Sequence, residues 1–587
     1  MEGPELSRLR VMLTTEGTYP FHRGGVSTWC DALVRRMEEV DFVVYALLMN
    51  PFVRQKYELP ANTLLRTTPL WGTEEPLEHL VEVPFAQIYA AKRRTTDDVI
   101  RAEFLPLLEP LLEAILEGGE GSGLQLGKTL HSLYQYFREY DYKATFKSAA
   151  AWHLFRERLA RRPSRNGRLP ASVFDAAQAL GWVYRFLLTV ANPVPEVEVT
   201  HSAAAAICGL PCVISKLERG TPYLLTEHGV YLREQYIALN RRRDMSSYSK
   251  DFLLSLVTAV ARTSYENADQ ISPVCAFNTR WERAFGVRPD KIRVIYNGVD
   301  PAVFARTPVV PEVRSTPTVV MVARIDPIKD VESVIRAART VREHMPEVKF
   351  LIYGGVAVPE YYQRCLELRA ELGLDSTVIF AGHTEDVAAA YRSGDVVVLA
   401  SISEGFPYSV VEAMMSGKAV VATDVGGVKE ALSDCGLLVP PRRPDQLASG
   451  ILRLLKDSSL RQSLGQEARE RALTYFTVAR FLEQYLESYI DLYELSGKRP
   501  AAELARDRQY LLSERGYALL ELGLRQEALE QFQLAVEADP GSVATPVLLL
   551  EKARIYLAIG QLNEAVNEME KAEVLTAVLE NPESAVA

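Results

Sequence analysis

Two carboxylates, Glu404 and Glu412, lie eight residues apart in a stretch whose apolar runs predict a strand, a loop, a short helix and a second strand. We expect Glu404 on the loop, Ser409 as the helix N-cap, and Glu412 three residues later, at the spacing of a capping box. A helix N-terminus suits a phosphate, and carboxylates accept hydrogen bonds from sugar hydroxyls. The pattern therefore suggests a sugar-nucleotide site. The alternative is that Glu412 only caps its helix and Glu404 is a solvated charge.

A basic pair, Arg324 and Lys329, lies where a predicted strand over 319–323 ends and a helix starts. Arginine brings a planar fork of donors and lysine a point charge, so the pair can hold a diphosphate from two sides. The alternative is a solvated arginine beside a surface lysine.

Two further features of the N-terminal half could serve a ligand. Gly24-Gly25 precede a predicted helix from Val26 to about Met37, where a phosphate can approach the backbone closely; the alternative is an ordinary turn. His228 follows a predicted strand over 223–227, and open α/β sheets bind ligands at the carboxyl ends of their strands. The alternative is a surface or capping histidine.

The predicted elements that position these residues alternate between strands and helices, which predicts an α/β fold. Residues from about 52 to 192 interrupt it and read as a mostly helical insertion. Within the insertion, Ser122 to Thr129 looks like a phosphate loop, but it lacks the first glycine and follows a helical stretch, so we interpret it as a helix–helix linker. The predicted strands cover 10–14, 41–48, 198–201, 223–227, 270–273, 291–295, 319–323, 349–354, 378–382, 396–400 and 419–423, with a linker over 307–318.

Composition excludes several classes of protein. The 587 residues are 48% hydrophobic and 24% charged with a net charge of −10, so an extensive basic nucleic-acid surface is not expected. The six cysteines are scattered, complete no zinc site and read as reduced thiols of a cytosolic protein. No apolar run approaches the roughly 18 residues that span a bilayer, so we expect a cytoplasmic location with at most peripheral membrane association.

The C-terminal part contains a repeat with an offset of 37 residues. Residues 514–523 align with 551–560, and Glu527-Ala528 align with Glu564-Ala565. Two tetratricopeptide-like helical hairpins are predicted. Two repeats bury little surface alone, so we expect them to dock on the enzyme or on a protein partner.

The motifs resemble a known family. Glu404-x7-Glu412, with Gly405, Phe406 and the small-residue helix, resembles the pattern of retaining family-4 glycosyltransferases with the GT-B fold. Residues 16–27, EGTYPFHRGGVS, and 226–231, TEHGVY, look like the PelF-type members of bacterial exopolysaccharide synthesis. The resemblance covers about residues 10–495.

That resemblance implies two Rossmann-like domains facing across a cleft. The implied order is an N-terminal acceptor domain over 1–306 with the insertion, a nucleotide-sugar domain over 307–475, a crossover helix over 476–499, and the repeats over 500–587. It implies transfer of a hexose, with retention and without a metal or other cofactor, from UDP-glucose or another UDP-hexose. The acceptor would be a growing polysaccharide or a lipid-linked sugar.

The resemblance also assigns roles to residues. Glu404 would hold donor sugar hydroxyls, Glu412 the ribose, and His228 would lie near the reacting carbon. Arg324 and Lys329 would stabilise the leaving diphosphate. The implied catalytic set is His228, Glu404, Arg324 and Lys329, and the implied donor-binding set is Gly24, Gly25, Arg324, Lys329, His383, Glu404, Gly405, Phe406, Ser409 and Glu412.

Two other functions fit the same fold. One is a phosphorylase or epimerase. The other is a nucleotide-binding scaffold without activity, which would be expected to have lost Glu404, Arg324 or Lys329, whereas all three are present.

Overall fold

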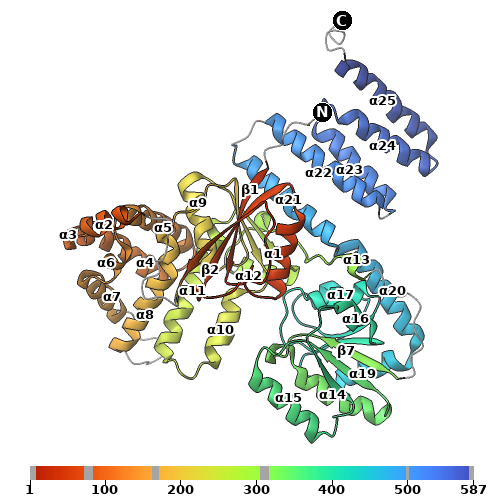
Figure 1. Cartoon of the computed structure of the whole chain (residues 1–587), viewed down its shortest axis with the longest axis horizontal. Coiled ribbons are helices and arrows are strands. Elements are labelled where there is room, and N and C mark those ends of the chain that lie inside the picture. The colour runs from red at the N-terminus through yellow and green to blue at the C-terminus, as the bar shows by residue number, and fades with distance from the viewer. Residues whose placement is uncertain are drawn as a thin grey trace. The chain divides into compact units, whose positions relative to one another are not determined.

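The structure is a computed structural model that describes residues 8–71, 84–161, 171–304, 316–497, 501–521 and 523–580. The chain forms two units, Met1–Phe481 and Leu482–Ala587. The first unit contains two six-stranded sheets with helices around them, and the described part of the second is helical (Figure 1). The predicted fold class, two Rossmann-like domains followed by a helical C-terminal module, is therefore confirmed.

The N-terminal lobe is built on a parallel sheet with strand order β3-β2-β1-β4-β5-β6. Apart from the edge strand β3, its strands are short, mostly apolar runs that are largely buried, as expected of parallel strands covered on both faces. They are β1 (Leu9–Glu16), β2 (Val40–Leu48), β3 (Thr63–Pro69), β4 (Val199–Ser202), β5 (Tyr223–Glu227) and β6 (Gln270–Pro273). The helices of this lobe outside the insertion are α1 (Gly25–Arg36), α9 (Leu210–Arg219), α10 (Tyr231–Arg241), α11 (Ser247–Asn267), α12 (Thr279–Ala284) and α13 (Pro301–Phe304).

Two strand predictions for this lobe were wrong. The alternation of strands and helices continues through β3, inside the segment expected to be a helical insertion. This edge strand was missed because it is half exposed and carries polar residues instead of an apolar run. Residues 291–295 do not form a strand. They run beside β6 with a single bridge between Ile271 and Ile292, and the Arg293 N–H donates to the Ile271 carbonyl at 2.9 Å.

The insertion itself is helical from Phe85 onward. Its helices are α2 (Phe85–Arg94), α3 (Asp97–Val99), a π-helical turn over Ile100–Phe104, α4 (Leu105–Glu117), α5 (Ser122–Glu139), α6 (Tyr142–Phe146), α7 (Ala149–Arg161), α8 (Val173–Phe186) and a 3-10 turn over Leu187–Ala191. The Ser122–Thr129 stretch is thus the first part of α5. It is neither a phosphate loop nor the expected linker.

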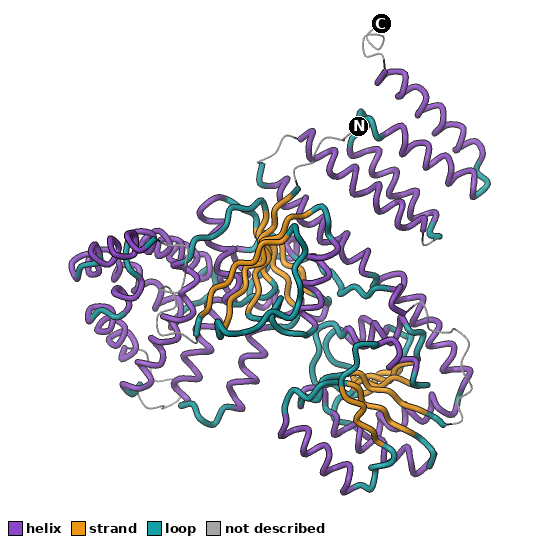
Figure 2. The backbone as a smooth tube through the Cα atoms, in the orientation of Figure 1, coloured by secondary structure: helices purple, strands orange, loops and turns teal. Residues whose placement is uncertain are grey.

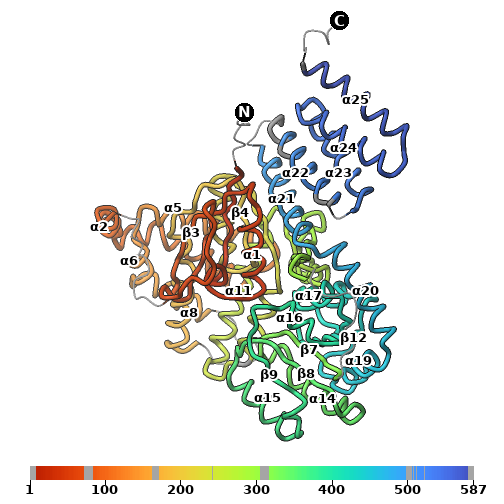
Figure 3. The backbone as a smooth tube through the Cα atoms, turned by 45° about the vertical axis from the view of Figure 1, so that its right-hand side comes forward, coloured from red at the N-terminus to blue at the C-terminus, as the bar shows by residue number. Residues whose placement is uncertain are grey.

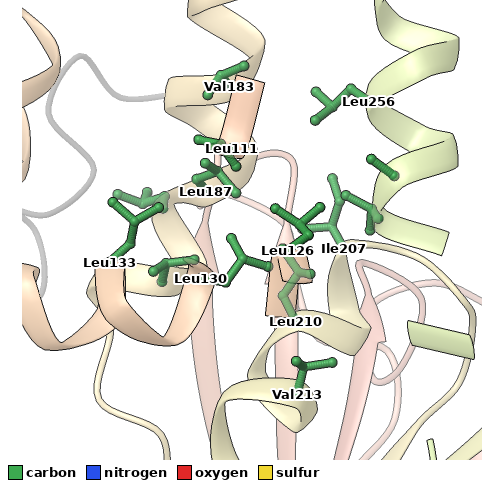
Figure 4. Packing of buried hydrophobic residues seen from close by; sticks show 14 of the residues in the cluster. Leu111, Leu126, Leu130, Leu133, Val183, Leu187, Ile207, Leu210, Val213 and Leu256 are labelled. Atoms are coloured by element: carbon green, nitrogen blue, oxygen red, sulfur yellow. The ribbon is translucent and has the colours of Figure 1, made fainter. Parts of the chain in front are cut away.

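The insertion shares a hydrophobic core with the N-terminal sheet domain. Leu126, Leu130 and Leu133 of α5 belong to the same buried cluster as Ile207 and as Leu210 and Val213 of α9 (Figure 4). Because these leucines recur at helical spacing, α5 presents one apolar stripe to the lobe. The insertion is therefore packed into the N-terminal lobe and shares its core.

The C-terminal lobe repeats the design with strand order β12-β11-β10-β7-β8-β9, and all its strand pairs are parallel (Figure 2). Its strands are β7 (Thr318–Val322), β8 (Lys349–Tyr353), β9 (Val378–Gly382), β10 (Val396–Leu399), β11 (Ala419–Thr423) and β12 (Leu437–Val439). Its helices are α14 (Val331–His344), α15 (Pro359–Glu371), α16 (Val387–Arg392), α17 (Tyr408–Met415), α18 (Val428–Leu432), α19 (Pro444–Lys456) and α20 (Ser458–Tyr475). The predicted linker and domain boundary near residue 306 fall largely on 305–315, outside the described residues.

The chain returns to the N-terminal lobe after α20, as the predicted crossover requires. The Val299 N–H donates to the Phe476 carbonyl and the Val478 N–H donates to the Val299 carbonyl, both at 2.9 Å. Helix α21 (Val478–Leu495) begins there, and the ring of Phe481 lies 6.3 Å from that of Trp29 on α1. This return ties the two lobes together at the backbone level.

After the remainder of α21, the described part of the second unit forms two helical hairpins with the expected spacing. They are α22 (Ala501–Glu521) with α23 (Arg525–Ala538) and α24 (Thr545–Ala558) with α25 (Leu562–Glu580), lying side by side in chain order (Figure 3). Their tetratricopeptide character stays a prediction.

Two predictions from composition can be compared with the structure. All six cysteines are free thiols, as predicted, and five of them are buried. Among the described helices, none is long and apolar enough to cross a bilayer.

Candidate active site

Glu404 and Lys329 form a close ion pair in the C-terminal lobe. The Lys329 Nζ lies 2.5 Å from Glu404 Oε1, and the two side chains are only 18% and 10% exposed. Glu404 lies on the loop between β10 and α17, and Lys329 ends a 3-10 turn over Pro327–Lys329, just before α14. The Ile402 N–H donates to the Ile328 carbonyl at 2.8 Å and holds the two loops together. Two residues selected independently by type and spacing thus meet.

Arg324 lies on the same side of the sheet but remains exposed. It follows β7, five residues before Lys329, and its side chain enters none of the ion pairs found among the described residues. Its guanidinium is therefore available to an anionic ligand, whereas Lys329 already compensates Glu404.

The predicted capping box at Ser409 is wrong. Helix α17 starts at Tyr408, Pro407 is its N-cap, and among the described residues no side chain caps it. Ser409 is thus the second residue of the helix and Glu412 lies one turn inside it. The prediction was wrong because Pro407 fixes a backbone suited to the N-cap, and the helix therefore starts two residues earlier than Ser409 as N-cap would give.

Glu412 faces Tyr391 of α16. The Tyr391 hydroxyl lies 2.9 Å from Glu412 Oε2 and 3.0 Å from the Ser409 carbonyl. Burial raises the pKa of Glu412, although the Tyr391 hydrogen bond partly opposes this. The Tyr391 hydroxyl is the donor toward both Glu412 Oε2 and the Ser409 carbonyl, so Glu412 is held on the side of α17 that faces α16. The simpler alternative, a glutamate that caps its own helix, does not describe this contact.

Glycines bring the Glu404 loop against His228. A Cβ added to Gly405 would overlap the carbonyl oxygen of His228, and one added to Gly427 would lie 2.7 Å from the Gly405 carbonyl oxygen. The Gly427 N–H donates to that same oxygen at 2.7 Å. Only residues without a side chain permit this approach, so the loop that carries Glu404 is fixed against the N-terminal lobe.

Phe406 is a packing residue. Its ring lies 5.0 Å from that of Tyr296 and 5.1 Å from that of Phe476, inside a core shared by the two lobes. Its carbonyl accepts a hydrogen bond from Asn297 Nδ2 at 3.1 Å. The side chain therefore anchors the loop from below and is not placed to contact a ligand.

His228 lies directly after β5 with its imidazole in an apolar setting. Its ring lies 4.6 Å from that of Trp29 in an edge-on arrangement, and burial lowers the pKa of His228 to about 3. Its Nε2 finds no hydrogen-bond partner among the described residues. The imidazole is therefore neutral at physiological pH, and its Nε2 is a buried nitrogen whose hydrogen-bonding capacity is not used by the described residues.

Gly24 and Gly25 are exposed at the start of α1, as predicted. Gly24 is the N-cap and, within the described chain, no side chain caps this helix. A Cβ built on Gly25 would lie 3.7 Å from the ring of Tyr408, the first residue of α17. The N-terminal ends of α1 and α17 therefore lie close together, and their dipoles favour an anion between them.

His383 is exposed on the loop after β9, and no described contact joins it to the Glu404 loop. Asp386, three residues later, caps α16 by accepting from the Ala389 N–H at 2.8 Å. The neighbouring Glu385 lies 3.4 Å from Arg23. The loop that carries His383 thus lies beside the segment that leads into Gly24-Gly25.

Two features of the site went unrecognised in the sequence. Arg233 of α10 donates to the Ser403 hydroxyl at 2.8 Å, next to Glu404. Glu430 of α18 accepts the N–H groups of Ala276 and Phe277 at 2.7 and 2.5 Å. The sequence shows both residues near recognised motifs but gives no signal for contacts between segments more than 150 residues apart.

A buried carboxyl pair lies behind His228. Burial and the charge of Glu282 raise the pKa of Glu227 well above its usual value, and burial raises the pKa of Glu282 to about 7. Tyr265 donates a hydrogen bond to Glu227. Burial disfavours the charged form of both carboxylates, so at least one of the pair holds a proton at neutral pH.

Among the described residues, no group of histidine, cysteine, aspartate and glutamate side chains is arranged to hold a metal ion.

In a comparison with known proteins, the two lobes match two different family descriptions. Residues 308–471 match the family described as glycosyl transferases group 1, and residues 9–290 match a domain of unknown function (DUF3492). Trehalose synthase of Pyrococcus horikoshii is 34% identical over 183 residues, 29% of this chain and 43% of that protein. D-inositol 3-phosphate glycosyltransferase of Corynebacterium efficiens is 32% identical over 234 residues, 36% of this chain and 54% of that protein. The chain thus spans about half the length of these curated relatives.

A solved structure extends the likeness to both lobes. Sucrose-phosphate synthase of Thermosynechococcus elongatus superposes with a TM-score of 0.52 at 18% identity and covers 83% of this chain and 100% of its own. At this identity the likeness concerns the fold. Residues 308–471 are therefore similar to the group 1 glycosyl transferases, and the two lobes have the GT-B architecture.

Proposed function

We propose that the chain is a retaining glycosyltransferase that moves a hexose from a UDP-hexose, with UDP-glucose as the first candidate, to a growing exopolysaccharide. The group 1 family match over residues 308–471 supports transfer of a sugar from a nucleotide sugar. The choice of UDP, the polysaccharide or lipid-linked acceptor and the PelF type rest on the sequence motifs of the N-terminal lobe. A cytoplasmic location, with at most peripheral attachment to the inner membrane, belongs to the same proposal.

The observation that carries the proposal is the 2.5 Å pairing of Lys329 with Glu404. In a nucleotide sugar, the hexose is attached directly to the terminal phosphate of the diphosphate. A site for such a donor needs a cation for that phosphate next to an acceptor of hydrogen bonds for the sugar hydroxyls. Lys329 and Glu404 provide these two groups in contact.

The diphosphate would be held from both lobes. Arg324 is exposed beside Lys329, and the N-terminal ends of α1 and α17 approach each other at Gly25 and Tyr408. As the glycosidic bond breaks, negative charge develops on the leaving phosphate, and preorganised cations and N–H dipoles stabilise it. We propose that these groups suffice without a divalent cation.

The chemistry would proceed on one face of the sugar. The acceptor hydroxyl attacks the anomeric carbon from the side that the diphosphate leaves, its oxygen bonds to that carbon, and its proton passes to the departing phosphate oxygen. His228 is neutral at physiological pH, so it would not act as an acid in this step. Its unpaired Nε2 would instead hold a donor sugar hydroxyl near the reacting carbon.

The proposal is tested by incubating the full chain with UDP-glucose and other UDP-hexoses and measuring release of UDP and the anomer of the product. We expect turnover that survives EDTA and yields a product with the anomeric configuration of the donor. An inverted product would contradict retention. Activity that EDTA abolishes and Mg²⁺ or Mn²⁺ restores would contradict metal independence, and formation of a sugar phosphate from polymer and inorganic phosphate would indicate a phosphorylase.

A further inference from the structure

The last helix of the chain, α25, carries an apolar stripe that nothing among the described residues covers. Leu562, Val566 and Met569 are 64%, 46% and 48% exposed, respectively. They are four and three residues apart, so they lie along one side of the helix. Ala565, Glu568 and Ala572, on another side, are buried toward α24. We call Leu562, Val566 and Met569 the outer stripe.

The repeat shows what such a stripe is suited to contact. With the offset of 37 residues, Val566 and Met569 correspond to Leu529 and Phe532 of α23, which are only 4% and 0% exposed. Leu529 and Phe532 share a hydrophobic cluster with Leu548 and Ile555 of α24, the next helix along the chain. The same side of the hairpin is thus covered by a helix in the first repeat and uncovered in the second.

We propose that the outer stripe binds an amphipathic α-helix of a different protein, in the place that α24 takes on α23. The stripe is apolar over about two helical turns, which matches the apolar side of one such helix. A capping repeat at the end of an array is expected to present a polar outer side. In α25 the outer stripe is apolar, as expected of a surface that another helix covers.

The charges beside the stripe define the chemistry of the partner. Glu570 and Glu573 are exposed and lie four residues after Val566 and Met569, respectively. The one cation of α25, Lys571, already pairs with Glu568 at 2.8 Å. A second copy would bring its own glutamates against these two, and like charges repel. The partner helix is therefore expected to carry lysine or arginine beside its apolar residues.

A labelled peptide provides the test. The probe has the sequence of residues 545–558, the helix α24 that covers α23. It carries the substitution Glu551→Lys, which adds a positive charge. We expect saturable binding to the full chain in a fluorescence anisotropy titration. Val566→Lys and Met569→Lys should each weaken it at least tenfold, and the unaltered 545–558 sequence should bind more weakly than the lysine-containing probe.

The matched control is Val574→Lys. Val574 is also exposed, at 65%, on the same helix but away from the outer stripe. The Val574→Lys protein should therefore bind the probe with unchanged affinity. Circular dichroism and donor turnover report whether each variant remains folded. Absence of binding, or equal loss in the Val566 and Val574 variants, would overturn the proposal. A concentration-dependent dimer that Val566→Lys dissociates would also overturn it, in favour of a second copy.

Discussion

In the proposed donor site, Lys329 and Glu404 neutralise each other. Lys329 and Glu404 are nearly buried and form a 2.5 Å pair, whereas Arg324 is exposed. Breaking a buried pair by removing one partner leaves an uncompensated charge, which is costly. The two basic residues should therefore respond differently to substitution, although both face the proposed diphosphate.

Replacing either basic residue by alanine should weaken nucleotide binding. A charge-assisted hydrogen bond is worth roughly 1.5–3 kcal/mol, so Arg324→Ala and Lys329→Ala should each lower UDP affinity about tenfold or more. Lys329→Ala should also lower the melting temperature, because it leaves Glu404 without its partner. Calorimetry and thermal melting measure both effects.

The control for this pair is Arg339→Ala, which removes an exposed cation of the same lobe that pairs with Glu343 at 3.4 Å. Arg339→Ala should change neither the UDP affinity nor the melting temperature appreciably. Normal UDP affinity in both the Arg324 and Lys329 variants would defeat the assignment of the diphosphate site.

The buried pair Glu227 and Glu282 predicts a dependence of stability on pH. Burial raises the pKa of Glu282 from 4.5 to about 7, so the folded protein favours the protonated form. The resulting stability is present below pH 4.5 and is lost as the pH rises through about 7. Glu282→Gln removes this titration. The free energy of unfolding of the variant, minus that of the parent protein, should therefore be larger at pH 8 than at pH 5, by roughly 3 kcal/mol at most.

Urea unfolding at both pH values measures this difference, with Glu343→Gln as the exposed control. A Glu282→Gln variant whose free energy of unfolding relative to the parent is the same at pH 5 and pH 8 would show that the carboxyl pair holds no proton through burial.

Residue types and spacing predicted part of this site. Glu404, Arg324 and Lys329 could be selected because their chemistry suits a nucleotide sugar and each follows a recognisable strand. The Lys329–Glu404 contact could not, since it joins residues 75 positions apart whose loops meet only in the folded lobe. Ser409 was misassigned because capping preferences do not fix a helix start to the residue, and here Pro407 begins it.

At the scale of elements, the loop between β10 and α17 is held by close backbone packing. Gly405 lies against the carbonyl of His228, and Phe406 fills a core that also contains Tyr296 and Phe476. The loop is therefore positioned from both lobes. Small changes in its backbone should displace Glu404 without unfolding the sheet.

Gly405→Ala is expected to reduce donor turnover strongly while the protein stays folded. The added Cβ would overlap the His228 carbonyl oxygen, so the loop must shift, and misplacement of a binding group by about 1 Å can cost roughly 100-fold in rate. Donor hydrolysis and circular dichroism measure the two effects. Gly181→Ala is the control, because a Cβ there meets nothing within 4 Å. Full activity of Gly405→Ala would show that the contact does not position Glu404.

Elements were predicted well where their apolar runs are buried on both faces. The strands β2, β5, β10 and β11 lie within one residue of their expected bounds. Strand β3 was missed because an edge strand can be half exposed and polar, and it then looks like part of a loop. Residues 291–295 have the apolar pattern of a strand but make only an isolated bridge.

At the scale of the whole molecule, the return of the chain after α20 links the C-terminal lobe to the surroundings of His228 in the N-terminal lobe. Val299 pairs with Phe476 and Val478, and Phe481 packs on Trp29, whose ring contacts His228. The beginning of α21 thus supports the histidine through one intervening side chain. The helical hairpins beyond residue 500 include none of the proposed donor-site residues.

Two truncations separate these parts. A chain of residues 1–499 should keep UDP binding and donor hydrolysis, because it retains the return segment and the start of α21. A chain that ends at residue 477 should lose both, since it removes Phe481 from Trp29 and half of the backbone pairing at Val299. Solubility, UDP affinity and hydrolysis are measured for each. A 1–499 protein that is soluble but inactive would show that the hairpins belong to the catalytic unit.

The central claim is that Glu404 and Lys329 bind the sugar and the diphosphate of one donor molecule. It is tested most directly by comparing Glu404→Gln with Glu412→Gln for both UDP affinity and turnover of UDP-glucose. Glu404→Gln keeps the shape of the side chain but removes the charge that faces the sugar, so turnover should fall at least tenfold while UDP affinity stays nearly unchanged. Glu412→Gln should weaken UDP binding as well, if it holds the ribose. A Glu404→Gln enzyme that turns over UDP-glucose at the parental rate would contradict the account.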